Sequence, residues 1–113
     1  MVRAPDKLVQ LRDREKFVAA NRDAWNEAAS RHAAHNHAKL REQFIKGGCN
    51  FLADEVVSML EAIGVRDKSV VQIACNNGID LLSLKGMGAG RCLGIDQAEQ
   101  FLEEARELAE LAG

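Results

Sequence analysis

The stretch Val70–Gly78 combines a short apolar, β-branched segment with a polar turn that is suited to holding a ligand. In open α/β sheets, ligands bind at the carboxyl ends of the strands, where the backbone must turn sharply and leave room. Glycine allows this best, and asparagine also tolerates left-handed backbone geometry. Ala74 and Asn76 occupy positions where two glycines would be expected, and Gly78 is the one true glycine of the turn. The segment therefore predicts a strand, a ligand-binding turn and a helix, in that order.

A carboxylate follows at a spacing that suits the same ligand. Asp96 lies eighteen residues after Gly78, at the end of a second short apolar segment. Its two oxygens can accept hydrogen bonds from both hydroxyls of a ribose. The alternative is that Asp96 only caps the helix that begins near Ala98. The spacing alone favours neither interpretation.

The spacing within the turn distinguishes between two classes of nucleotide site. A dinucleotide-binding fingerprint has its third glycine three positions after the second, and here that position is Ile79. The Ala74-x-Asn76-x-Gly78 spacing instead resembles the G-x-G-x-G turn of S-adenosylmethionine (SAM) methyltransferases. A dinucleotide-binding module is therefore the less favoured interpretation.

The resemblance extends from about Asn21 to Gly113, and it is to a bacterial subfamily of class I SAM-dependent methyltransferases. The segments that carry it are Asn21–His32, Phe44 with Gly47-Gly48, Ser69–Gly78, Ile79–Leu84, Leu93–Asp96 and Ala105–Ala109. In this subfamily the first motif often has Gln-Cys-Asn/His-x-Gly in place of Gly-Cys-Gly-x-Gly. Together these segments form a more specific pattern than the turn alone.

The resemblance implies that SAM contacts Ala74, Cys75, Asn76, Gly78, Asp96 and Gln97. By that resemblance, the backbone of the turn holds the methionine end of SAM, Asp96 holds the ribose, and Gln97 lies near the adenine. Asp80 also fits the subfamily pattern, although its role could be only to cap the helix after the turn. The chain departs from the pattern at Gln72, where the family usually has an acidic residue, and at Lys39, where relatives often carry a tyrosine.

Hydrophobic periodicity and turn residues divide the chain into a helical region, residues 1–65, and a mixed region, residues 66–113. The helices expected in the first region are Leu8–Val18, Asn21–His35, Ala38–Ile45 and Leu52–Ile63. The second region is expected to contain strands Ser69–Ala74 and Arg91–Ile95 and helices Ile79–Lys85 and Ala98–Ala112.

This order predicts an α/β fold: a helical N-terminal extension followed by the first βαβα portion of a Rossmann-like, doubly wound parallel sheet. A complete class I methyltransferase has seven strands, so the sheet is expected to be incomplete. We therefore expect a homo-oligomer or a second chain that completes the sheet, because open strand edges recruit partners.

Composition excludes several other classes of protein. The 113 residues suffice for one domain, and 15 basic against 17 acidic residues leave no basic excess for nucleic acid. No apolar run approaches the roughly 20 residues of a membrane span, and no secretory signal follows Met1. Three widely spaced cysteines favour a reducing, cytoplasmic setting.

The remaining reactive side chains carry weaker hypotheses. His32, His35 and His37 are close in sequence, but nothing nearby completes a metal site, and we expect no metal. Cys75 precedes a helix, but the sequence shows no base that would activate it as a nucleophile. The acidic side of the last helix, Glu103, Glu104, Glu107 and Glu110, is expected to be solvated.

The leading functional hypothesis is therefore a SAM-dependent methyltransferase, or its cofactor-binding half, that acts on a small-molecule acceptor. The sequence assigns no catalytic residue and no acceptor. The alternative is a catalytically inactive, truncated methyltransferase-like subunit that acts through protein–protein contacts.

Overall fold

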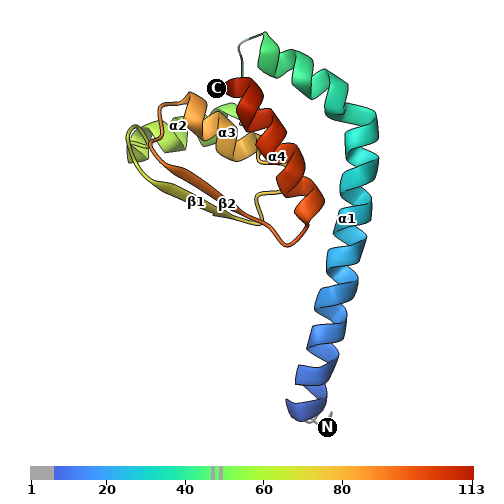
Figure 1. Ribbon diagram of the computed structural model, residues 1–113. Coiled ribbons are helices and arrows are strands. Elements are labelled where there is room, and N and C mark those ends of the chain that lie inside the picture. The colour runs from blue at the N-terminus through green and yellow to red at the C-terminus, as the bar shows by residue number, and fades with distance from the viewer. Residues whose placement is uncertain (1–6, 47, 49) are drawn as a thin grey trace.

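The computed structural model describes residues 7–46, 48 and 50–113 (Figure 1). The elements are α1 (Lys7–Ile45), α2 (Asp54–Ile63), β1 (Val70–Ile73), α3 (Ile79–Gly86), β2 (Cys92–Ile95) and α4 (Glu99–Ala112). The two strands are parallel, with Val70 opposite Cys92 and Ile73 opposite Ile95. The strand–helix–strand–helix order predicted for the second half of the chain is confirmed.

Helix α1 is one uninterrupted element of 39 residues, so the prediction of three separate helices over its length is wrong. The physical reason is that no glycine or proline occurs between Lys7 and Ile45. Asparagine at Asn21 weakens a helix only slightly, far less than a proline would. The first half of α1 projects away from the body, and the second half runs beside α4 (Figure 1). Within the described residues, no helix has both the length and the apolarity needed to cross a membrane.

The sheet is covered on one face only. Helices α3 and α4 lie on the same side of it (Figure 1), and the side chains that face them are partly buried. The opposite face carries two cross-strand pairs, Val71 with Leu93 and Ile73 with Ile95. These four side chains are 48–79% exposed, with Ile73 the most exposed. Parallel strands are usually covered on both faces, so this apolar face lacks a partner among the described residues.

The contact between α1 and α4 contains a cluster of buried residues. Ala29 of α1 packs against Ala98 and Phe101, and all three are at most 2% exposed. The ring of Trp25 lies 6.3 Å from that of Phe101, centroid to centroid. The small side chain of Ala29 allows the helices to approach closely, and the two aromatic rings fill the space beside it.

Asn26 of α1 also caps the first turn of α4. Residue Ala98, at the start of α4, has no side chain that could do so. The N–H of Gln100 donates to Asn26 Oδ1 at 3.3 Å, and Asn26 Nδ2 donates to Glu99 Oε2 at 3.2 Å. A backbone hydrogen bond, the Asn26 bond and the nearby Arg22 charge lower the pKa of Glu99 below its ordinary value of 4.5. This carboxylate therefore favours the folded state above that ordinary value, and its contribution is lost as the pH falls through the lowered pKa.

We predict that Gly94→Ala destabilises the fold, because Gly94 lies where β2 meets the turn and α3. A Cβ there would lie 2.8 Å from Cys75 Sγ and 3.2 Å from Leu81 Cδ2. Overpacking of this kind costs roughly 1–3 kcal/mol. Urea unfolding should show this decrease in the free energy of unfolding. Adding Cys75→Ala to the Gly94→Ala variant should restore part of the lost stability, because it removes the sulfur that the new Cβ would contact.

The matched control is Gly48→Ala, because a Cβ at Gly48 meets no atom within 4 Å. Equal effects of the two alanine substitutions would show that the space beside Gly94 does not limit stability.

Candidate ligand-binding groove

The turn after β1 has the alternating left-handed backbone that its sequence predicts. The φ angles are 58° at Ala74, 56° at Asn76 and 78° at Gly78. The turn stays close to the sheet, because the Cys75 N–H donates to the Ile95 carbonyl at 3.0 Å. The glycine-like positions of the motif are therefore glycine-like in conformation, although only one of them holds a glycine.

Two asparagine side chains stabilise the turn from within. The N–H of Asn77 donates to Asn76 Oδ1 at 2.8 Å, and the N–H of Ile79 donates to Asn77 Oδ1 at 3.5 Å. Asparagine readily forms such local bonds and tolerates the left-handed region. The turn is thus ordered by its own polar side chains before any ligand is bound.

Asp96 joins the turn to the start of α4. Its Oδ2 accepts from the Asn76 N–H at 2.8 Å, and its Oδ1 accepts from the Ala98 N–H at 2.9 Å. The second bond is the capping interaction expected in the alternative interpretation. Each carboxylate oxygen can accept more than one hydrogen bond, so both retain capacity for a donor from a ligand. The role of Asp96 in holding a ribose stays a prediction.

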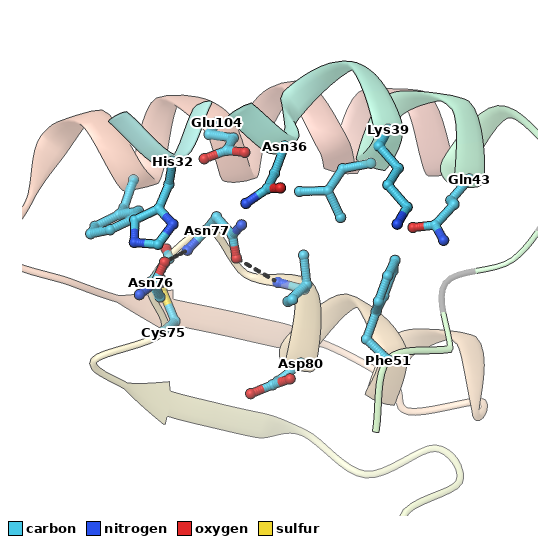
Figure 2. A pocket seen from close by; sticks show the side chains of 13 residues that line it. His32, Asn36, Lys39, Gln43, Phe51, Cys75, Asn76, Asn77, Asp80 and Glu104 are labelled. Atoms are coloured by element: carbon cyan, nitrogen blue, oxygen red, sulfur yellow. Dashed lines mark hydrogen bonds between the residues drawn. The ribbon is translucent and has the colours of Figure 1, made fainter. Parts of the chain in front are cut away.

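A groove of about 540 Å³ opens between α1, α4 and the turn (Figure 2). From α1 it is lined by His32, Asn36, Lys39, Leu40 and Gln43. From the rest of the chain it is lined by Phe51, Cys75, Asn76, Asn77, Ile79, Asp80, Phe101 and Glu104. Its volume falls within the range of roughly 300–1,000 Å³ typical of small-ligand pockets.

The structure brings the six predicted cofactor-contacting residues to one end of the sheet, but only two of them line the groove. Cys75 and Asn76 are in its wall, together with Asp80. Gly78 is buried against α4, where a Cβ would lie 3.2 Å from the Cβ of Ala105. Ala74, Asp96 and Gln97 lie outside the lining of the groove; Ala74 and Gln97 are exposed, and Asp96 is partly buried.

The sequence reasoning considered His32 and Lys39 but did not identify the other groove residues of α1, which are Asn36, Leu40 and Gln43. Asn36 and Gln43 share a helix face with Lys39, at spacings of three and four residues. The spacing is visible in the sequence, but these side chains form one continuous helix face only when residues 32–43 belong to a single helix. The predicted break between His35 and Ala38 concealed it.

The thiol of Cys75 is a packing group and not an activated nucleophile. The residue is 4% exposed. Burial, and next the negative charge of Asp96, raise the pKa of this thiol above its ordinary value of 9.0. The thiolate fraction at neutral pH is therefore small. Within the described part of the chain, no three or more His, Cys, Asp or Glu side chains cluster in a way that could hold a metal ion.

The expectation that the glutamates of α4 are all solvated is wrong for Glu104. This residue is 6% exposed, whereas its neighbours Glu103 and Glu107 are exposed. Its Oε1 lies 3.5 Å from Nδ1 of His37, and the other ring nitrogen of His37 lies 3.2 Å from Glu107 Oε2. Helix α1 covers Glu104, which the sequence of α4 alone could not reveal.

We predict that Ala74→Gly stabilises the protein. A non-glycine residue in the left-handed region costs roughly 1–2 kcal/mol. Glycine avoids this cost but loses more conformational entropy on folding than alanine does, which costs roughly 0.5–1 kcal/mol. The expected net gain is about 0.5–1 kcal/mol in the free energy of unfolding, measured by urea titration.

The control is Ala109→Gly in the exposed part of α4, which should lose about 1 kcal/mol. A loss of similar size at Ala74 would contradict the left-handed conformation of the turn.

Comparison of this chain with protein-family models, with curated proteins and with solved structures finds no match. The observations that bear on function are therefore those of the site itself: the left-handed turn at the end of β1, the Asp96 carboxylate beside it, and the groove closed by α1.

Proposed function

We propose that this chain is the cofactor-binding half of a SAM-dependent methyltransferase. The observation that carries the proposal is the turn, with left-handed residues at Ala74, Asn76 and Gly78 and with Asp96 hydrogen-bonded to its middle. A turn of this shape lies at the carboxyl end of a parallel strand, where such folds bind nucleotides. The proposal also rests on the resemblance of the sequence from Asn21 to Gly113 to that family.

The residues of the site fit such a cofactor. Asp96 keeps acceptor capacity on both oxygens for ribose hydroxyls. The groove beside Asn76 combines apolar walls, Phe51 and Phe101, with amide and charged side chains. SAM would supply an electrophilic methyl group. The described residues of this chain would bind and orient it, and catalysis by such an enzyme is largely positioning.

The proposal predicts that the full 113-residue chain binds S-adenosylhomocysteine. Titration of ¹⁵N-labelled protein should shift the backbone amide signals of Asn76, Gly78 and Asp96. Asp96→Asn should weaken the binding roughly ten-fold or more, because a charged acceptor contributes roughly 1.5–3 kcal/mol per hydrogen bond. Asparagine has one acceptor oxygen for the two N–H groups, of Asn76 and Ala98, that Asp96 now binds. The amide signals of the ligand-free variant must therefore show that the turn is retained.

Glu103→Gln is the matched control, since it removes one negative charge from an exposed position of the adjacent helix. The proposal fails if millimolar S-adenosylhomocysteine leaves the turn signals in place, or if both variants bind equally well.

A specific observation also favours the alternative, a non-catalytic subunit that acts through protein contacts. The sheet has two strands, and each has an outer edge with no partner strand among the described residues. Its bare face is apolar, and α2 has no buried residue and exposes Val56, Met59 and Ile63. Unpaired edges and bare apolar surface both favour association.

Under this alternative, the chain self-associates at micromolar concentration through the bare sheet face. Sedimentation velocity should show dimers or larger species, and the double variant Ile73→Thr/Leu93→Thr should shift them toward the monomer. Threonine has the β-branched shape that strands prefer, but its hydroxyl replaces apolar surface. Phe17→Gln, which removes an exposed apolar side chain from α1, is the control. A compact, cooperatively folded monomer of the unaltered chain would exclude the alternative.

A further inference from the structure

The carboxylate of Glu104 is the most unusual polar group in the groove. It lines the groove and is 6% exposed, and among the described residues its buried Oε2 has no hydrogen-bond partner. Figure 2 shows this carboxylate on the α1–α4 side of the groove, with Asn36 between it and Lys39. A buried carboxylate without a partner is costly, and native proteins normally pair such a charge.

Among the described residues, the basic side chain within ion-pair distance of Glu104 is His37. Its Nδ1 lies 3.5 Å from Glu104 Oε1 and has no hydrogen-bond partner in that part of the chain. The other nitrogen of the same ring faces Glu107 at 3.2 Å. One imidazole therefore lies between two carboxylates, and Glu104 Oε2 is left for a donor that comes from outside the chain.

A cation lines the same groove from the facing helix. Lys39 lies seven residues after His32, on the face of α1 that lines the groove. The amide side chains of Asn36 and Asn77 also line the groove. The carboxylate on α4 and the ammonium group on α1 are complementary in charge to a ligand that carries both an ammonium group and a carboxylate, as an α-amino-acid group does.

We infer that the groove binds an α-amino-acid group, with its ammonium hydrogen-bonded to Glu104 and its carboxylate facing Lys39. This inference rests on the proposed function in one respect: the amino-acid group is either the methionine end of SAM or a free amino acid that serves as acceptor. Both sources present the same chemistry to the two side chains. The resemblance to methyltransferases assigns no role to Glu104, and Lys39 is a departure from the pattern of the family.

Three ligands distinguish these possibilities when titrated into the full chain by calorimetry. S-adenosylhomocysteine has both the nucleoside and the amino-acid group, methylthioadenosine lacks the amino-acid group, and L-methionine lacks the nucleoside. Glu104→Gln, which keeps the shape and removes the charge, should weaken S-adenosylhomocysteine roughly ten- to hundred-fold, as loss of a charge-assisted hydrogen bond does. Its affinity for methylthioadenosine should change less than two-fold. Lys39→Met should give the same pattern.

Glu107→Gln is the matched control, because it removes a carboxylate that contacts His37 without lining the groove. It should leave the binding of all three ligands unchanged. Circular dichroism and urea unfolding of Glu104→Gln show whether the variant is folded, and we expect it to be at least as stable as the unaltered chain. If it does not fold, Lys39→Met, at an exposed position, provides the same comparison.

The outcomes separate the inference from the proposed function. If the unaltered chain binds methylthioadenosine and S-adenosylhomocysteine, and Glu104→Gln affects neither, the inference is wrong and the cofactor proposal stands. If the unaltered chain binds only L-methionine, and Glu104→Gln abolishes that binding, the amino-acid site stands and the cofactor proposal falls. Failure of all three ligands to bind would overturn both.

Discussion

The packing of α1 on α4 is the interaction on which the rest of the molecule depends. Two strands of four residues each bury too little surface to hold a fold together. Helix α3 packs on β2 and against α4, and α1 covers α4 with Ala29 packed against Phe101. The same contact caps α4 through Asn26, buries Glu104 and forms one wall of the groove. Removal of α1 would therefore eliminate one wall of the candidate site as well as the cluster around Ala29.

Asp96 extends this dependence to the turn. Its two oxygens bridge the Asn76 N–H of the turn and the Ala98 N–H at the start of α4. The position of the turn is thus linked to the helix that α1 holds, although α1 and the turn are distant in sequence. This arrangement keeps a strained backbone, with a left-handed alanine at its first position, in one conformation. A polar network that is fixed in this way is suited to ligand recognition because little needs to be ordered on binding.

The sequence predicted the elements from α2 onward well and the continuity of α1 poorly. The strands, the turn and α4 depend on local signals: β-branched runs, a glycine, and apolar residues at helical spacing. The continuity of α1 was missed because asparagine is only a weak signal for a helix end. The burial of Glu104 was missed for a different reason, since it depends on His37 and other residues of α1 that lie more than sixty positions earlier. The groove could not be predicted for the same reason, because it combines residues of α1 and α4, at opposite ends of the chain, with residues of the turn between them.

The bare face of the sheet has a consequence for the thermodynamics of unfolding. Heat capacity rises on unfolding mainly because apolar surface becomes hydrated, by about 1.2–1.5 kcal/mol/K for a domain of 100 residues. Here Val71, Ile73, Leu93 and Ile95 are already 48–79% exposed in the folded chain, so they add less newly hydrated surface. The isolated chain should therefore have a heat-capacity change below that range, with a flatter curve of stability against temperature. The same four side chains would restore an ordinary value once a second polypeptide covered them.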